Sequence, residues 1–186
     1  MDDRSGAGSG AAAAREGGVS GEVPSIALSV RQPWAWAVVH AGKDIENRSR
    51  FAITKGGLKQ FRRIAVHAAI GMTQDEYENG RSFMARLGII CPRPDELVRG
   101  GIIGAVTITD VVKYSESPWF FGPCGLVLQD PVSFDPIACK GALGLFTWVR
   151  PPEHADQLAE ALPWMISWPD RPSRREAVGN VQESLL

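Results

Sequence analysis

Hydrophobic and polar residues first fall into a clear pattern near residue 26. Ile26, Leu28 and Val30 are apolar and are separated by the smaller residues alanine and serine. A two-residue period of this kind is typical of a strand with one buried face. Pro33 follows, and apolar residues then recur at helical spacing as far as Gly42. The pattern therefore predicts a strand followed by a short helix of about nine residues that begins at Pro33.

The rest of the chain alternates between apolar runs and one further helical segment. Thr73 and Glu76 have the spacing of a capping box, which predicts a helix from there to about Leu87. The apolar runs predict further strands at residues 44–51, 64–68, 102–112, 126–129 and 143–149. Short strands with two helices between them favour an α+β fold, a small mixed β-barrel with two or three flanking helices.

The two ends of the chain differ in composition from its middle. Residues 1–24 are rich in glycine, alanine and serine, which predicts a disordered tail. Residues 25–150 form the expected folded domain. Residues 151–186 are acidic and contain the apolar sequence PWMISW, starting at Pro163. This segment either docks onto the domain and covers a strand edge, or binds a protein partner.

Composition narrows the class of protein. The chain has 186 residues, of which 44% are hydrophobic and 22% charged, as in a soluble globular domain. No apolar stretch is long enough for a membrane span, and we expect a cytoplasmic protein. The three cysteines are too widely spaced for a zinc motif, so we expect buried, reduced thiols. Nothing in the sequence requires a metal or an organic cofactor.

Charge is concentrated in one segment, although the whole chain has a net charge of only −1. Residues 43–63 contain seven basic and two acidic residues, a net charge of +5. Such a field attracts phosphate groups, but a strand edge protected by cations gives the same pattern. The side chains that we assign to nucleic-acid backbone contacts are Arg50, Lys55, Lys59, Arg62 and Arg63.

The junction between the first strand and the first helix is one candidate binding site. Arg31 and Gln32 lie beside the free backbone amides of the helix start, and Trp34 follows. These groups could hold an anion, contact a base edge and stack on a base. Packing of Trp34 in the core is the simpler explanation for that residue.

The junction after the helix is the second candidate. Glu46 and Arg48 are two residues apart, so they project from the same face of an extended strand, and Lys43 lies where the helix ends. A carboxylate flanked by two cations can accept protons from amino groups or orient the cations toward a phosphate. Simple ion pairing across strands would produce the same spacing.

Several separated motifs together resemble one family. The sequence QPWA at 32–35 is followed by Gly42-Lys43, Glu46 and Arg48 in the pattern GKxxExR. Further matching blocks are IAVHAA at 64–69, GGIIGAVTITDVV at 100–112, SPWFFGPCGLVLQDP at 117–131 and IACKGALGLF at 137–146. In this order they resemble the ASCH family, the activating signal cointegrator homology domain, over residues 25–150.

The resemblance implies a PUA-like β-barrel and a function in RNA metabolism. Its cleft beside the first helix is expected to bind single-stranded RNA, a modified nucleoside or a nucleotide. The resemblance would place Gln32, Trp34, Lys43, Glu46 and Arg48 in or beside that cleft. His67, in the IAVHAA block, would be a further member or a histidine bonded to the backbone. Trp119 lies in an aromatic loop that either stacks on the ligand or packs into the barrel.

Some small ASCH proteins are amidohydrolases that deacylate N4-acetylcytidine, which gives an alternative function. Lys43 matches their catalytic lysine, and Glu46 stands where they have a threonine. An enzyme would then need Glu46 as a general base for water and Lys43 to stabilise an oxyanion. Thr54 and Thr107 are the remaining candidate nucleophiles. Because the expected hydroxyl is missing, the sequence favours a binding module over this enzyme.

Overall fold

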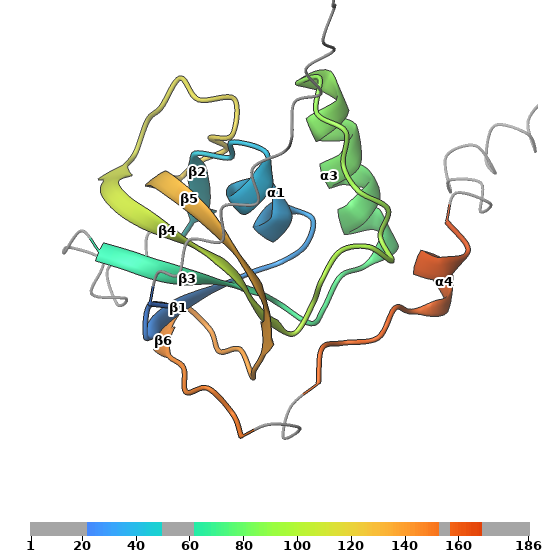
Figure 1. Ribbon diagram of the computed structural model, residues 1–186. Helices are drawn as coiled ribbons and strands as arrows, with labels where there is room; N and C mark the ends of the chain where they lie inside the picture. Colours follow the sequence, from blue (N-terminus) through green and yellow to red (C-terminus); the bar gives the residue numbers. More distant parts are fainter. Residues whose placement is uncertain (1–21, 50–61, 153–156, 169–186) are drawn as a thin grey trace, which may run out of the picture.

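A curled sheet of six strands, in the shape of a half-barrel, forms the centre of the protein (Figure 1). The computed structural model describes residues 22–49, 62–152 and 157–168. The strand order is β2-β5-β4-β3-β1-β6, in which β1 and β3 are parallel and all other neighbours are antiparallel. The strands are β1 (Ile26–Val30), β2 (Ile45–Arg48), β3 (Arg62–Ala68), β4 (Gly101–Val112), β5 (Cys124–Ala138) and β6 (Leu145–Thr147).

Three helices accompany this sheet in the described part of the chain, which confirms an α+β fold with a mixed, curled sheet. They are α1 (Trp34–His40), α3 (Gln74–Arg86) and α4 (Pro163–Ile166). Helix α1 packs on the sheet through Ala35, Val38 and Val39, which share a core cluster with residues of β1, β3, β4 and β5. A second cluster lies between α1, α3 and α4. The pocket described below opens beside this second cluster.

Both predicted helices are present close to their predicted bounds. The capping box is confirmed, because Thr73 Oγ1 accepts a hydrogen bond from the Glu76 amide at 3.2 Å. In return, the Thr73 amide donates to Glu76 Oε2 at 2.8 Å. Gly80 lies inside α3, where a glycine normally weakens a helix. Its position has a packing reason, since a Cβ there would lie 2.5 Å from Pro33 Cγ.

Strand β5 is much longer than the predicted strand at 126–129. The observed strand continues through two prolines, Pro131 and Pro136, a residue type that sheets tolerate mainly at edges and bulges. In the structure β2 pairs only with residues 124–127 of β5. Beyond this point β4 is its only paired neighbour among the described residues, with register shifts along the pair. An outer edge does not need every backbone N–H, so it tolerates proline.

The C-terminal segment docks onto helix α3 and not over a strand edge. Met165 is fully buried in the second core cluster. The rings of Trp164 and Trp168 lie 6.2 Å and 5.0 Å from the ring of Tyr77 on α3. Arg81, also on α3, places its guanidinium 5.8 Å from the Trp168 ring. These tryptophans therefore pack within the chain. This agrees with the predicted alternative that the segment docks onto the domain, although it covers α3 and not a strand edge.

The remaining expectations concern the cysteines, membrane-spanning helices and the N-terminal tail. Cys91, Cys124 and Cys139 are buried and are not in disulfide bonds, as predicted. Within the described ranges, no helix has the length and apolar character needed to cross a membrane. The proposed disordered tail falls mainly on residues 1–21, which lie outside the described residues. Pro24, the last residue of the predicted tail, is described, and its carbonyl accepts a hydrogen bond from Trp148 Nε1 at 2.6 Å.

Docking of the C-terminal segment can be tested with two adjacent residues. Met165→Ala should lower the free energy of unfolding by about 2–5 kcal/mol, because it empties a buried site. Ile166→Ala is the matched control: its side chain is 63% exposed, and its effect should stay within about 0.5 kcal/mol. Urea unfolding of the two variants measures the difference. Equal effects would show that the segment does not pack as described.

Candidate functional site

A pocket of about 250 Å³ opens where helix α1, strand β2 and the loop after β4 meet. It is smaller than typical drug-sized sites, which start at about 300 Å³. Its lining combines two aromatic rings with a cation, a carboxylate and an amide. The lining residues are Trp34, Lys43, Glu46, Asn47 and Phe121. The two sequence junctions that were predicted as separate candidates thus contribute to one site.

The turn after α1 brings Lys43 into the pocket wall. Gly42 has a φ of +66°, a conformation that favours glycine and lets the chain reverse at the helix end. The Lys43 amide then donates to the Ala37 carbonyl at 3.1 Å. The Lys43 side chain is only 2% exposed, and its Nζ donates to the Ile45 carbonyl and to Glu46. The lysine is therefore fixed in position and not a mobile surface charge.

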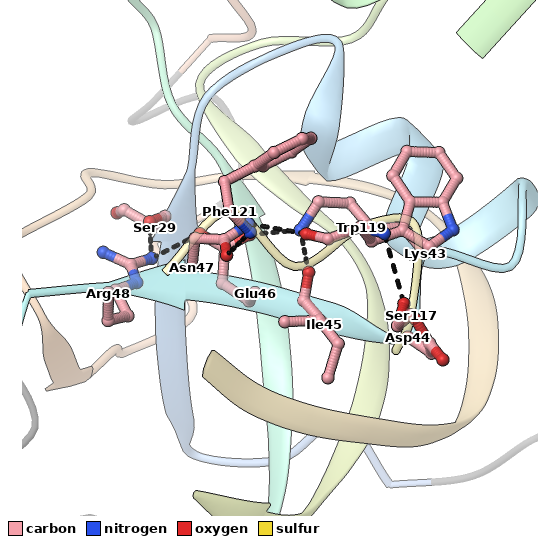
Figure 2. Close-up of polar contacts among 10 residues, drawn as sticks. All are labelled: Ser29, Lys43, Asp44, Ile45, Glu46, Asn47, Arg48, Ser117, Trp119 and Phe121. Atoms are coloured by element: carbon pink, nitrogen blue, oxygen red, sulfur yellow. Dashed lines mark hydrogen bonds and ion pairs between the residues drawn. The ribbon is translucent and has the colours of Figure 1, made fainter. Parts of the chain in front are cut away.

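Glu46, on strand β2, lies between two cations, Lys43 and Arg48 (Figure 2). Its Oε2 lies 2.7 Å from Lys43 Nζ, and its Oε1 lies 3.2 Å from Arg48 Nη2. The predicted shared face of Glu46 and Arg48 is therefore confirmed. Burial of a carboxylate is costly unless it is paired, and here each oxygen has a positively charged partner.

Arg48 lies behind Glu46 and connects the pocket to the sheet. Its Nη2 donates to the Ser29 carbonyl at 2.9 Å, while its buried Nε has no partner among the described residues. The Ser29 hydroxyl lies 3.0 Å from Nδ1 of His67. A polar chain thus runs from the pocket through β2 and β1 to β3, although Arg48 and His67 do not line the pocket.

His67 has both ring nitrogens occupied by the protein. Nε2 lies 3.1 Å from the Cys139 carbonyl, which can only accept, so Nε2 donates and Nδ1 accepts from Ser29. The residue is 1% exposed, and burial lowers the pKa of the imidazole below its ordinary value of 6.5. The structure therefore favours the backbone-bonded alternative for His67 over contact with a ligand.

Asn47 positions the aromatic loop that forms the far wall (Figure 2). Its Nδ2 donates to the Trp119 carbonyl at 2.8 Å, and its Oδ1 accepts from the Phe121 amide at 2.8 Å. Trp119, the predicted loop residue, is 4% exposed and belongs to the core. Phe121, two residues later, is the ring that lines the pocket. Asn47 was not among the predicted site residues, and Phe121 belongs to the aromatic loop for which Trp119 was the predicted residue.

Trp34 both packs in the core and lines the pocket. Its ring packs against Phe83 at 5.9 Å and Trp119 at 6.4 Å, so it belongs to the core. It also lines the pocket and lies 6.4 Å from Phe121, with 62° between the ring planes. Core packing therefore holds the Trp34 ring rigidly at the pocket wall.

Gln32 and Arg31 are not brought to the pocket. Gln32 is 1% exposed; its Nε2 donates to the Val98 carbonyl at 2.7 Å and its Oε1 accepts from the Trp36 amide at 2.9 Å. Its amide thus joins the start of α1 to the segment before β4. Arg31 instead forms an ion pair with Glu76 at 2.6 Å, at the start of α3. Both residues support the fold around the helix.

The basic segment is described only at its ends. Arg50, Lys55 and Lys59 lie outside the described residues, as does Thr54. Arg62 and Arg63 begin strand β3, and neither lines the pocket. Arg63 donates to Thr107 Oγ1 at 3.1 Å and to the Asp130 carbonyl, so it joins three strands. Thr107, a candidate nucleophile, does not line the pocket either.

Other chemistry in the described part of the chain is limited. No group of three or more potential metal ligands is present among the described residues. A larger hollow of about 410 Å³ lies between the chain before β1 and the chain after β6. Its lining includes Glu22 and Arg150, close to segments outside the described residues. The pocket at β2 is therefore the site whose walls are best defined.

The burial of His67 predicts a pH dependence of stability. Because its pKa is lower in the folded protein than its ordinary value of 6.5, the unfolded chain binds more protons as pH falls below about 6.5. The free energy of unfolding should therefore decrease over that range. His67→Gln should be less stable at neutral pH but should show a smaller decrease, measured by urea unfolding between about pH 7 and pH 5.

His40 provides the control for this experiment. Burial also lowers the pKa of His40, whose ring lies on Trp36 at 5.9 Å. His40→Gln should consequently remove a separate part of the pH dependence and leave the part due to His67. A His67→Gln protein with the full original pH dependence would contradict a neutral, buried His67.

Comparison with known proteins does not identify a family or a function for this chain. The chain matches no protein-family model and no curated protein. The functional inference therefore depends on the chemistry of the pocket formed by Trp34, Lys43, Glu46, Asn47 and Phe121.

Proposed function

We propose that this protein is a PUA-like module of the ASCH type that binds single-stranded RNA, or a modified nucleoside within it. The observation that carries the proposal is the pocket at β2, in which a buried Lys43–Glu46 pair faces two aromatic rings. We place the protein in the cytoplasm, because three cysteines outside disulfide bonds suit a reducing compartment.

The shape and walls of the pocket suit a single planar base. Its volume of about 250 Å³ is small for a large cofactor. Trp34 and Phe121 provide aromatic surfaces on which a base can stack, a contact that tolerates every base. RNA recognition commonly combines stacking of this kind with hydrogen bonds to the base edge.

The polar groups suit the hydrogen-bonding edge of a base. A carboxylate offers about four acceptor positions and an ammonium three donors. Glu46 uses one position on each oxygen, for Lys43 and Arg48, and Lys43 uses two donors within the protein. One acceptor position on Glu46 Oε2 and one donor on Lys43 Nζ thus remain unused, and these two atoms lie 2.7 Å apart. Every base has an acceptor next to a donor on its pairing edge, which complements this pair.

The positions of the family-like motifs support the assignment. Trp34 comes from the first motif, Lys43 and Glu46 from the second, and Phe121 from the aromatic block. These separated segments line one pocket. Their convergence on one pocket fits a common ligand.

Binding is favoured over the amidohydrolase alternative. Among the described residues that line the pocket, none has a hydroxyl or thiol to act as a nucleophile. Glu46 would have to activate water while it pairs with Lys43 and Arg48. These two ion pairs already involve both oxygens of the carboxylate.

Replacement of Glu46 tests the proposal directly. Glu46→Gln should weaken binding of the preferred nucleoside about tenfold to a hundredfold, because a hydrogen bond to a charged group contributes about 1.5–3 kcal/mol. The measurement is calorimetric titration with the four ribonucleosides and N4-acetylcytidine. Binding of short single-stranded RNA should also weaken as salt increases.

Glu116→Gln is the matched control, since Glu116 is exposed and lies on the loop that leads to the pocket. It should bind as the unchanged protein does, and unfolding midpoints verify that both variants are folded. Equal nucleoside affinity of Glu46→Gln and the unchanged protein, or no binding of any probe, would disprove the proposal. Release of cytidine from N4-acetylcytidine, lost in Lys43→Ala, would instead establish the amidohydrolase.

A further inference from the structure

We propose a second nucleotide subsite beside the pocket, formed by Phe121 and Arg86. It rests on the proposed function and extends it, because it makes the ligand a strand with at least two linked nucleotides. One base occupies the pocket, the neighbouring base stacks on the outer side of Phe121, and Arg86 pairs with the phosphate between them. The chemistry recognised is a base–phosphate–base unit, in RNA or in single-stranded DNA.

The exposure of Phe121 is the first observation. This side chain lines the pocket but remains 57% exposed. Its ring is packed edge to face, with centroids 5.0 Å from Phe83 and 6.4 Å from Trp34. The bond from its amide to Asn47 fixes the backbone at this point. An apolar ring held in position at a pocket rim can stack on a second base, which contributes about 1–3 kcal/mol in single-strand binding proteins.

The position of Arg86 is the second observation. It lies in the last turn of α3, and its guanidinium carbon is 5.4 Å from the centroid of the Phe83 ring. Phe83 in turn contacts Phe121, so a cation borders the aromatic group that surrounds the pocket. None of the ion pairs found among the described residues involves Arg86. Its charge is therefore available to a phosphate, which guanidinium groups bind well.

The arrangement distinguishes a strand from a free nucleoside. The volume of the pocket suits one base, and its two charged residues are already paired: Lys43 with Glu46, and Glu46 also with Arg48 behind the pocket. A phosphate would find its partner outside the pocket, where Arg86 lies over Phe83, the ring that contacts Phe121. Alternation of a stacking ring and a cation along a path is the common pattern of single-strand binding.

The test compares each ribonucleoside with its 3′,5′-linked homodinucleotide, ApA, CpC, GpG or UpU, by calorimetric titration. For the base that the pocket prefers, the dinucleotide should bind about tenfold more tightly than the nucleoside. Arg86→Gln should remove most of this gain, leave nucleoside affinity unchanged and reduce the slope of log affinity against log salt by about one. Phe121→Leu should reduce the ratio of the two affinities.

Arg81→Gln is the matched control, because Arg81 lies on the same helix but over the Trp168 ring. It should keep the full dinucleotide gain. Deoxyribose dinucleotides measured in parallel distinguish RNA from DNA as the source of the strand; a gain that depends on Arg86 in either series supports the subsite. Glu46-dependent nucleoside binding without such a gain would overturn the second subsite alone. Absence of binding by every nucleoside and dinucleotide would overturn both proposals.

Discussion

The pairing of Glu46 with Lys43 and Arg48 is the interaction on which the pocket depends. A buried carboxylate is stable only when charged partners remain close, so the three side chains hold one another in place. Lys43 also bonds to the backbone of β2, and Arg48 to the backbone of β1. The network therefore fixes an edge strand of four residues, which backbone pairing on one side alone would hold less firmly.

The aromatic residues behind the pocket belong to a core that several segments share. Trp34 from α1, Phe83 from α3 and Trp119 from the loop after β4 are in mutual contact. Asn47 connects this group to β2 through the loop backbone. Because dense packing limits side-chain movement, the wall is already formed without a ligand, which lowers the entropic cost of binding.

Sequence reasoning succeeded where a short-range period or spacing determines geometry. The helix start at Thr73 follows from a local capping box, and the shared face of Glu46 and Arg48 follows from strand alternation. It failed where contacts with distant parts of the chain determine the position of a side chain or the length of a strand. Gln32 bonds to Val98, far along the chain, and an irregular loop has no period to show that Phe121 and not Trp119 faces the pocket. The full length of β5 likewise depends on which neighbours it has.

Helix α4 joins the region beyond residue 150 to the core that supports the pocket. Met165 shares a hydrophobic cluster with Tyr77 and Trp119, and the Ala159 amide donates to the Arg99 carbonyl at 2.9 Å. A recombinant fragment trimmed at Arg150, where the strands have ended, would leave Tyr77 uncovered and this cluster incomplete. The smallest autonomous folding unit should therefore extend at least to Trp168, well past the last β-strand.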